Sequence, residues 1–98
     1  DKEITIGDFR LSTELKILSA PNQDISLTVT ESAILETIFR FFPHIASRQQ
    51  ITRNIFDRTN KITSAQTLNV RLSELRKKLG IHSSHLEAIP NSGLRWKE

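Results

Sequence analysis

The sequence predicts a single α+β domain in which short antiparallel strands come first, three helices follow and a β-hairpin ends the chain. Apolar residues alternate with polar ones over the first 28 residues, as in strands that bury one face. From Thr28 onward the apolar residues recur every three or four positions, as along one side of a helix. After Gly80 the alternation returns on both sides of a Pro-Asn-Ser-Gly turn at residues 90–93, which indicates a hairpin.

The length and composition fit one small folded domain over residues 1–98. Ninety-eight residues, 37% of them hydrophobic, can bury one modest core and leave no room for a second domain. The absence of cysteine excludes disulfides and thiolate metal sites and agrees with a reducing compartment. No apolar stretch approaches the roughly 18 residues of a membrane span, and no signal peptide opens the chain. Because Asp1 is not an initiator methionine, we expect a fragment or processed product, with any receiver, transmembrane or sensor region outside it.

The N-terminal segment, residues 1–28, predicts a sheet of up to four short antiparallel strands. Its turns are marked by Gly7-Asp8 and by Pro21-Asn22, which favour reversals of the chain. The alternating apolar positions are Ile4 and Ile6, then Phe9 and Leu11, then Leu15 and Ile17, and finally Ile25 and Leu27.

Each of the three helices, within residues 29–80, is predicted to begin at a capping box. In this arrangement a Ser or Thr is followed three residues later by Glu or Gln, and each side chain binds the other's backbone N–H. We expect the first helix to stop at Pro43, the second to end before a polar loop at residues 57–62, and the third to end at Gly80. A loop at residues 81–84 then leads to the hairpin, residues 84–98. The three predicted boxes are Thr28 with Glu31, Ser47 with Gln50, and Thr63 with Gln66.

The third helix, at about residues 64–79, is predicted to have one buried and one exposed face. Its leucines, at positions 68, 72, 75 and 79, share one side and belong to the core. The opposite side is centred on Val70, an apolar side chain that gains from contact with an apolar group such as a thymine methyl. A scattered surface hydrophobe is the alternative. Around Val70 lie Gln66, Thr67, Ser73, Glu74 and Lys77, with Arg71 and Lys78 at the margin.

Positive charge is concentrated on the segment that contains this helix. Residues 48–78 hold eight basic and two acidic side chains, a net charge of +6, whereas residues 1–47 hold four basic and seven acidic ones, a net of −3. Such focusing is expected of a surface that binds phosphates. The alternative is an ordinary solvated helix, which would not require this segregation.

The side chains of the exposed face suit DNA. Thr67 and Val70 fit thymine methyls, Gln66 fits adenine, and Glu74 can accept from a cytosine amino group. We expect Arg71, Lys77 and Lys78 to contact phosphates. For Arg76 the sequence leaves a structural ion pair and a phosphate contact equally open. Ser47 is expected to cap the second helix, whose N-terminus can also receive a phosphate.

No pattern predicts catalysis, a cofactor or a metal site. The chain contains Ser, His and Asp, but no nucleophile elbow, phosphate-binding loop or paired-carboxylate signature organises them, so we do not expect an enzyme. His82 and His85 have a spacing found in metal sites. Without a third convergent ligand, we expect them to be solvated loop residues.

Four markers, in this order and spacing, resemble the winged-helix DNA-binding domain of the OmpR/PhoB type over about residues 4–96. They are LTVTE at residues 27–31, the Ser47-Arg48 pair, LRKKL at residues 75–79, and Gly93-Leu94-Arg95-Trp96 in place of the usual Gly-Tyr-Arg. The resemblance implies an α+β winged helix with an N-terminal four-stranded antiparallel sheet, a three-helix core and a C-terminal β-hairpin wing. It also implies a recognition helix in the major groove and a wing in the minor groove.

The resemblance adds wing residues to the site. Asn91, Ser92 and Arg95 become candidates for backbone or minor-groove contact; the alternative is that the hairpin only completes the core through Leu94 and Trp96.

Two departures separate the chain from the response regulators of this family. Those proteins often carry arginine where this chain has Glu74 and a wing arginine where it has Pro90, so neither arginine role carries over. Within the family, SELRKKL and the IPNSG hairpin look more like the membrane-tethered ToxR/CadC branch.

Together these observations predict a sequence-specific double-stranded DNA-binding domain of a bacterial transcription regulator. Promoter DNA is the expected partner; RNA polymerase and a second copy on tandem half-sites are further candidates, and this fragment is not expected to contact a membrane. The expected location is cytoplasmic, either in a free regulator or in one tethered to the membrane. The alternative is a winged-helix protein-interaction module that docks a protein such as RNA polymerase, through the third helix or residues 57–62, without binding DNA directly.

Overall fold

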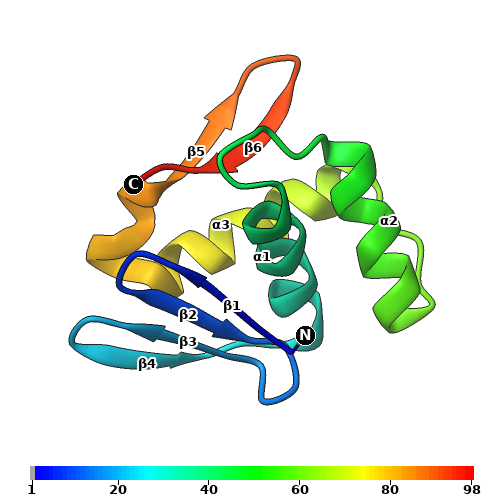
Figure 1. Ribbon diagram of the computed structural model, residues 1–98. Coiled ribbons are helices and arrows are strands. Elements are labelled where there is room, and N and C mark those ends of the chain that lie inside the picture. The colour runs from blue at the N-terminus through cyan, green and yellow to red at the C-terminus, as the bar shows by residue number, and fades with distance from the viewer. Residues whose placement is uncertain (1) are drawn as a thin grey trace.

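The N-terminal strands form a four-stranded antiparallel sheet that packs against the first helix. The computed structural model describes residues 2–98, and the strands β1 (Glu3–Ile6), β2 (Phe9–Ser12), β3 (Ile17–Ala20) and β4 (Gln23–Ser26) lie side by side in this order (Figure 1). The register places Leu11 opposite both Ile4 and Leu18, and Leu18 opposite Ile25, so that one apolar row crosses the sheet. Leu15 was expected in the third strand but lies in the turn before it with an exposed side chain, so that expectation was wrong.

Three helices and a hairpin follow. They are α1 (Val29–Phe41), α2 (Arg48–Thr59), α3 (Ala65–Leu79), the short 3-10 helix η1 (Gly80–His85), and the strands β5 (Leu86–Ile89) and β6 (Gly93–Trp96). The fold class predicted from the sequence is therefore confirmed. No helix within residues 2–98 has the length and apolar character that crossing a membrane requires.

Two of the three predicted capping boxes are present. Thr28 with Glu31 and Ser47 with Gln50 each form both reciprocal hydrogen bonds. The third prediction was wrong, because Ser64 and not Thr63 caps α3 and accepts a hydrogen bond from the Thr67 backbone N–H. Two adjacent hydroxyl residues both suited this role, and the sequence pattern selected the wrong one.

Two other boundaries also differ from the sequence-based expectation. Helix α2 does not end before residue 57 but continues through Thr59, because Asn60 adopts a left-handed conformation with φ of 61° and ends the helix there. The expected loop at residues 81–84 lies within η1. His82 is buried against Phe9 in this 3-10 helix, with the two rings 5.3 Å apart, so the expectation of a solvated loop histidine was wrong at this position.

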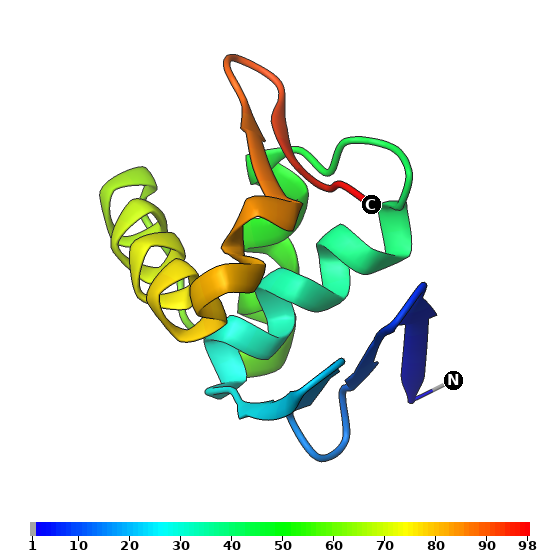
Figure 2. The same ribbon diagram turned by 90° about the vertical axis from the view of Figure 1, so that its left-hand side faces the viewer.

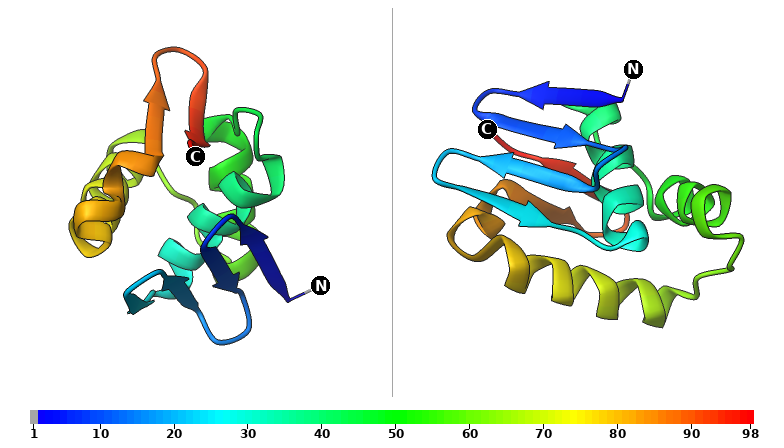
Figure 3. Two further views of the ribbon diagram at one scale, coloured as in Figure 1. Left: turned by 60° about the vertical axis from the view of Figure 1, so that its left-hand side comes forward. Right: turned by 90° about the horizontal axis from the view of Figure 1, so that it is seen from below.

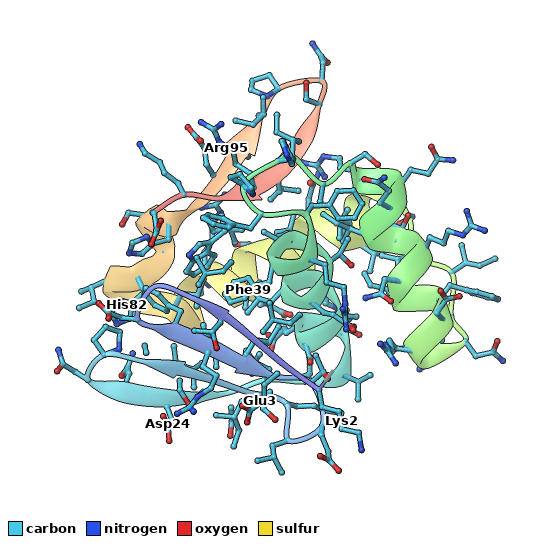
Figure 4. The ribbon with its side chains drawn as sticks, in the orientation of Figure 1. Lys2, Glu3, Asp24, Phe39, His82 and Arg95 are labelled. Atoms are coloured by element: carbon cyan, nitrogen blue, oxygen red, sulfur yellow. The ribbon has the colours of Figure 1, made fainter. Side chains whose placement is uncertain are left out.

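Helix α1 lies at the centre of the domain and is enclosed by the other elements (Figure 3). Its residues 31–39 are all buried, including two glutamates. Phe39 of α1 and Phe9 of the sheet both pack edge-on against Trp96 of the hairpin, with ring centroids 4.9 and 5.1 Å away. Figure 4 shows Phe39 in this interior, whereas Glu3 and Asp24 of the sheet are exposed. The hairpin is thus part of the core.

Strand β6 of the hairpin is attached to the chain just before α2. The backbones of Ala46 and Leu94 exchange two hydrogen bonds, of 2.7 and 2.9 Å. Gly93, beside this bridge, has φ of 148°, and a Cβ there would collide with the Ala46 carbonyl oxygen. The position of the hairpin relative to α2 therefore depends on glycine at this residue.

Candidate nucleic-acid interface

Helix α3 has the two faces that its sequence predicts. All four of its leucines are buried, with exposed fractions between 0% and 6%. The opposite side, called here the outward face, carries Val70 at 47% exposure in a surround of exposed polar side chains. The other members of the outward face are Gln66, Thr67, Ser73, Glu74 and Lys77, and all of them are exposed.

The N-terminal end of α3 and the tip of the hairpin both point away from the N-terminal sheet (Figure 2). Asn91 and Ser92 form the tip and are exposed; Asn91 adopts φ of 63°, which a tight turn requires. One side of the molecule therefore presents the start of a helix and the end of a wing together.

The first turn of α3 is ordered by hydrogen bonds among its hydroxyl groups. The Ser64 hydroxyl accepts from the Thr67 backbone N–H at 3.1 Å and donates to the Thr67 hydroxyl at 3.0 Å. The Thr67 hydroxyl is thereby used by the cap. Because its hydroxyl is already hydrogen-bonded, we expect Thr67 to contact an external ligand through its methyl group.

Charged groups on the outward face interact with one another. Arg71 donates to Glu74 at 3.0 Å, one turn further along α3. Because both side chains are about half exposed, this pair contributes less than about 1 kcal/mol and is readily exchanged for an external partner.

The structure adds two residues that the sequence-based site list omits. Arg48, at the start of α2, donates to the Asn69 side-chain oxygen on α3 at 2.8 Å, and both side chains are exposed. This contact brings a guanidinium from α2 to the margin of the outward face. Arg48 follows the Ser47 cap within the basic segment, a position that could have indicated it; Asn69 carries no such signal.

Two basic residues near the end of α3 are engaged inside the domain. Lys78 forms an ion pair of 2.7 Å with the buried Glu31 of α1 while its own side chain is 40% exposed, and its expected phosphate contact stays a prediction. Arg76, whose role the sequence left open, donates to the Leu86 carbonyl at 2.7 Å, and within residues 2–98 it forms no ion pair. Lys77, between them, is exposed on the outward face.

The net charge of +6 over residues 48–78 overstates the positive charge that is available to a ligand. Arg58 of α2 pairs with Glu36 of α1 at 2.7 Å, just as Lys78 pairs with Glu31. The two acids lie outside the segment in sequence but beside it in space. Burial alone would raise the pKa of the Glu36 carboxyl, but hydrogen bonds from Asn54, Arg58 and Arg40 and the charge of Arg58 hold that pKa below its ordinary value.

The wing combines a core role with an exposed tip. Leu94 and Trp96 are fully buried, as the alternative interpretation of the hairpin expected. Arg95 is partly exposed (Figure 4) and forms an ion pair of 2.6 Å with Glu87 on the neighbouring strand. Of the three wing candidates, the tip residues Asn91 and Ser92 are thus the exposed ones, whereas Arg95 already has a partner.

The histidines do not form a metal centre with other side chains of residues 2–98. His85 stacks on Trp96 at 5.3 Å, and its Nδ1 lies 2.6 Å from the Lys97 carbonyl oxygen. The aromatic cluster of Phe9, Phe39, His82, His85 and Trp96 accounts for both histidines as packing residues.

A three-helix core between an N-terminal sheet and a C-terminal hairpin defines the winged-helix class. The chain belongs to the family described as the C-terminal domain of transcriptional regulatory proteins, whose sequence model matches residues 22–96. This confirms the OmpR/PhoB-type resemblance. Among curated proteins, none matches the chain in sequence.

Solved structures of response-regulator domains and of CadC share the fold. The C-terminal domain of NsrR, a lantibiotic response regulator for nisin resistance, is 24% identical with a TM-score of 0.82, and the match covers 96% of this chain and 95% of that one. The DNA-binding domain of Escherichia coli CadC is 16% identical with a TM-score of 0.77, covering 98% and 92%. The Klebsiella pneumoniae RstA DNA-binding domain, solved in complex with the RstA box, is 17% identical with a TM-score of 0.75, covering 99% and 98%.

Proposed function

We propose that this domain binds promoter DNA, with α3 in the major groove and the hairpin in the adjacent minor groove. The observation that carries the proposal is the outward face of α3, where an exposed valine lies among polar side chains. The N-terminal end of this helix and the wing tip both lie away from the N-terminal sheet (Figure 2). An α-helix fits the major groove, and side chains at its N-terminal part reach the base edges. Membership of the transcriptional-regulator family supports the same function.

Base reading is assigned to the centre of the outward face. Val70 and the Thr67 methyl suit thymine methyls, Gln66 suits adenine, and Glu74 suits the amino group of cytosine. Ser73 lies among them and can bind a base edge or a phosphate. Phosphate contacts are assigned to Lys77, to Arg71 once it leaves Glu74, and to Arg48, whose guanidinium lies beside α3.

The wing supplies the second contact. Asn91 and Ser92 at the tip carry small polar groups that can bind the minor-groove edges or the sugar-phosphate backbone. Arg95 joins them only if it exchanges Glu87 for a phosphate. The backbone bridge to Ala46 holds the hairpin beside the start of α2.

An NMR titration of the domain with promoter fragments tests this proposal. Amide shifts should concentrate on α3 and on the wing tip, and imino shifts should report which base pairs are contacted. Binding should weaken steeply between low and physiological salt, because phosphate contacts release counterions. A weak salt dependence, or amide shifts confined to α2 and the loop after it, would contradict the proposal.

A second function, the docking of a protein without DNA, is favoured by one observation. Phe56 at the end of α2 and Ile62 in the loop before α3 are exposed, Ile62 by 90%, and they line a shallow hollow of about 380 Å³. Arg53 borders this hollow, so an apolar segment with acidic neighbours would fit it. RNA polymerase is the candidate partner for such a surface in a transcription regulator. An unaltered domain that binds polymerase but no duplex, together with loss of polymerase binding in Ile62→Ser, would identify this role.

The biological setting is proposed with the same function. We place the domain in the cytoplasm, where promoter DNA is accessible, either in a free regulator or in a membrane-tethered one of the ToxR/CadC branch. The SELRKKL and IPNSG segments support that branch. A second copy on a tandem half-site is compatible with a single recognition helix per domain, and band-shift titration on duplexes with one or two half-sites would count the copies.

A further inference from the structure

Helix α3, which carries the proposed DNA-binding surface, and its neighbour α2 are each tied to α1 by a buried carboxylate. Glu36 receives two hydrogen bonds from Arg58 and one from Asn54, both on α2. Glu31, one and a half turns earlier on α1, receives Lys78 of α3. Helix α1 is enclosed by the fold and has no exposed face there, so it is a fixed frame from which α2 and α3 take their orientation.

The Glu31 carboxylate joins three elements at one point. Its Oε1 accepts from the Lys78 ammonium at 2.7 Å and from the Thr28 backbone N–H at 2.9 Å, which is half of the capping box of α1. The same ammonium donates to the Ser26 carbonyl at the end of β4 at 3.3 Å. The last turn of α3 is thus held to the start of α1 and to the sheet.

The opposite side of the same turn is held by Arg76, which donates to the Leu86 carbonyl at the start of the wing. Two basic residues therefore bracket the end of α3, one toward the sheet and one toward the wing. Between them Lys77 remains exposed on the outward face. The geometry divides three consecutive basic residues into two that fix the helix and one that faces outward.

We infer that Lys78 is a positioning residue of the recognition helix and not a phosphate contact, an inference that rests on the proposed DNA binding. Glu31 is 3% exposed and carries its charge in the interior, where the Lys78 ammonium compensates it. If the Lys78 ammonium left Glu31 to bind a phosphate, the buried Glu31 carboxylate would lose the cation that compensates its charge. The pair instead sets the angle at which the outward face meets the bases, so that Lys78 acts on sequence choice through Glu31.

Five proteins test this inference, with Lys77→Gln as the matched control. The others are the unaltered domain, Lys78→Gln, Lys78→Arg, and the double variant Glu31→Gln with Lys78→Gln. Glutamine at position 31 keeps the oxygen that caps α1, and the double variant leaves no unpaired buried charge, so it remains folded even if the single variant does not. Circular dichroism establishes that each protein is folded. Affinity for a selected operator duplex and for a scrambled duplex is then measured over a range of salt.

Lys77→Gln should weaken binding to both duplexes equally and lower the salt slope by about one. Lys78→Gln and the double variant should keep the salt slope and scrambled-DNA affinity, yet lose at least about fivefold in preference for the operator, the equivalent of one base contact. Lys78→Arg should restore that preference. The double variant should lose no more operator preference than Lys78→Gln does, because Glu31→Gln and Lys78→Gln disrupt the same ion pair.

Two results would overturn the inference while leaving DNA binding intact. One is a salt slope that falls in the double variant as it does in Lys77→Gln, and the other is an operator preference that survives both Lys78→Gln and the double variant. Failure of the unaltered domain to bind any duplex would overturn the proposed function itself. The two failures are therefore distinguishable in one set of titrations.

Discussion

Replacing Glu74 by alanine tests base reading by the outward face of α3. The ionised carboxylate only accepts hydrogen bonds, so it pairs with the amino group of cytosine or adenine and is repelled by the acceptor edge of guanine. A good direct contact discriminates by about 1 to 3 kcal/mol. Glu74 must first leave Arg71, and such a half-exposed pair is worth about 0.2 to 1 kcal/mol. The expected net preference is about 1 to 2 kcal/mol, or roughly fivefold to thirtyfold at one base pair.

The assay is a selection from randomised duplexes at fixed salt, followed by titration of the selected and scrambled duplexes. Glu74→Ala should lose preference at one position while binding scrambled DNA at least as tightly, because a negative charge leaves a surface that faces phosphates. Asp57→Ala, on α2, removes the same charge outside the outward face and should recover the unaltered motif. Val70→Ala should lose preference for a nearby thymine. If all these proteins recover one motif with equal stringency, base reading by this face is wrong, and the wing or DNA shape determines sequence choice.

Three further predictions concern the fold that supports this surface. Leu75→Ala should lower the free energy of unfolding by about 2 to 5 kcal/mol through a cavity at a fully buried site. Val70→Ala should change it by less than about 0.5 kcal/mol in the same urea titration; equal effects would mean that the wrong face of α3 is assigned to the core. Because its folded-state pKa is lowered, Glu36 stabilises the domain above its unfolded-state pKa, and this contribution is lost as the pH falls through the folded-state value. Unfolding titrations should therefore show a decline below about pH 4.5 that is shallower in Glu36→Gln; identical pH profiles would exclude this role. Gly93→Ala should lower the melting temperature and displace the wing, since a Cβ collides with Ala46; unchanged amide shifts in the wing would contradict this.

The local pattern of the chain was sufficient for the elements and for the face of α3. The leucine spacing placed the buried side correctly, because a helix turns through a fixed angle per residue whatever packs against it. The capping boxes of α1 and α2 were predictable because both partners lie three residues apart. Local rules failed where two adjacent residues suited one role, as with Thr63 and Ser64, and where Asn60 took the left-handed conformation that ends α2.

The sequence by itself therefore determined the α+β order, the capping of two helices, and Val70 as the centre of the exposed side of α3. Only the tertiary structure decided which charges remain available to a ligand. Lys78 meets Glu31 across 47 positions, and Arg58 meets Glu36 across 22. No periodicity within one helix encodes such pairs, because they depend on how the helices pack around α1. The same packing joined Arg48 to Asn69 and fixed the wing beside Ala46. The local sequence pattern predicted which residues line this surface, whereas the packing of the helices decided which of their charges are available to a ligand.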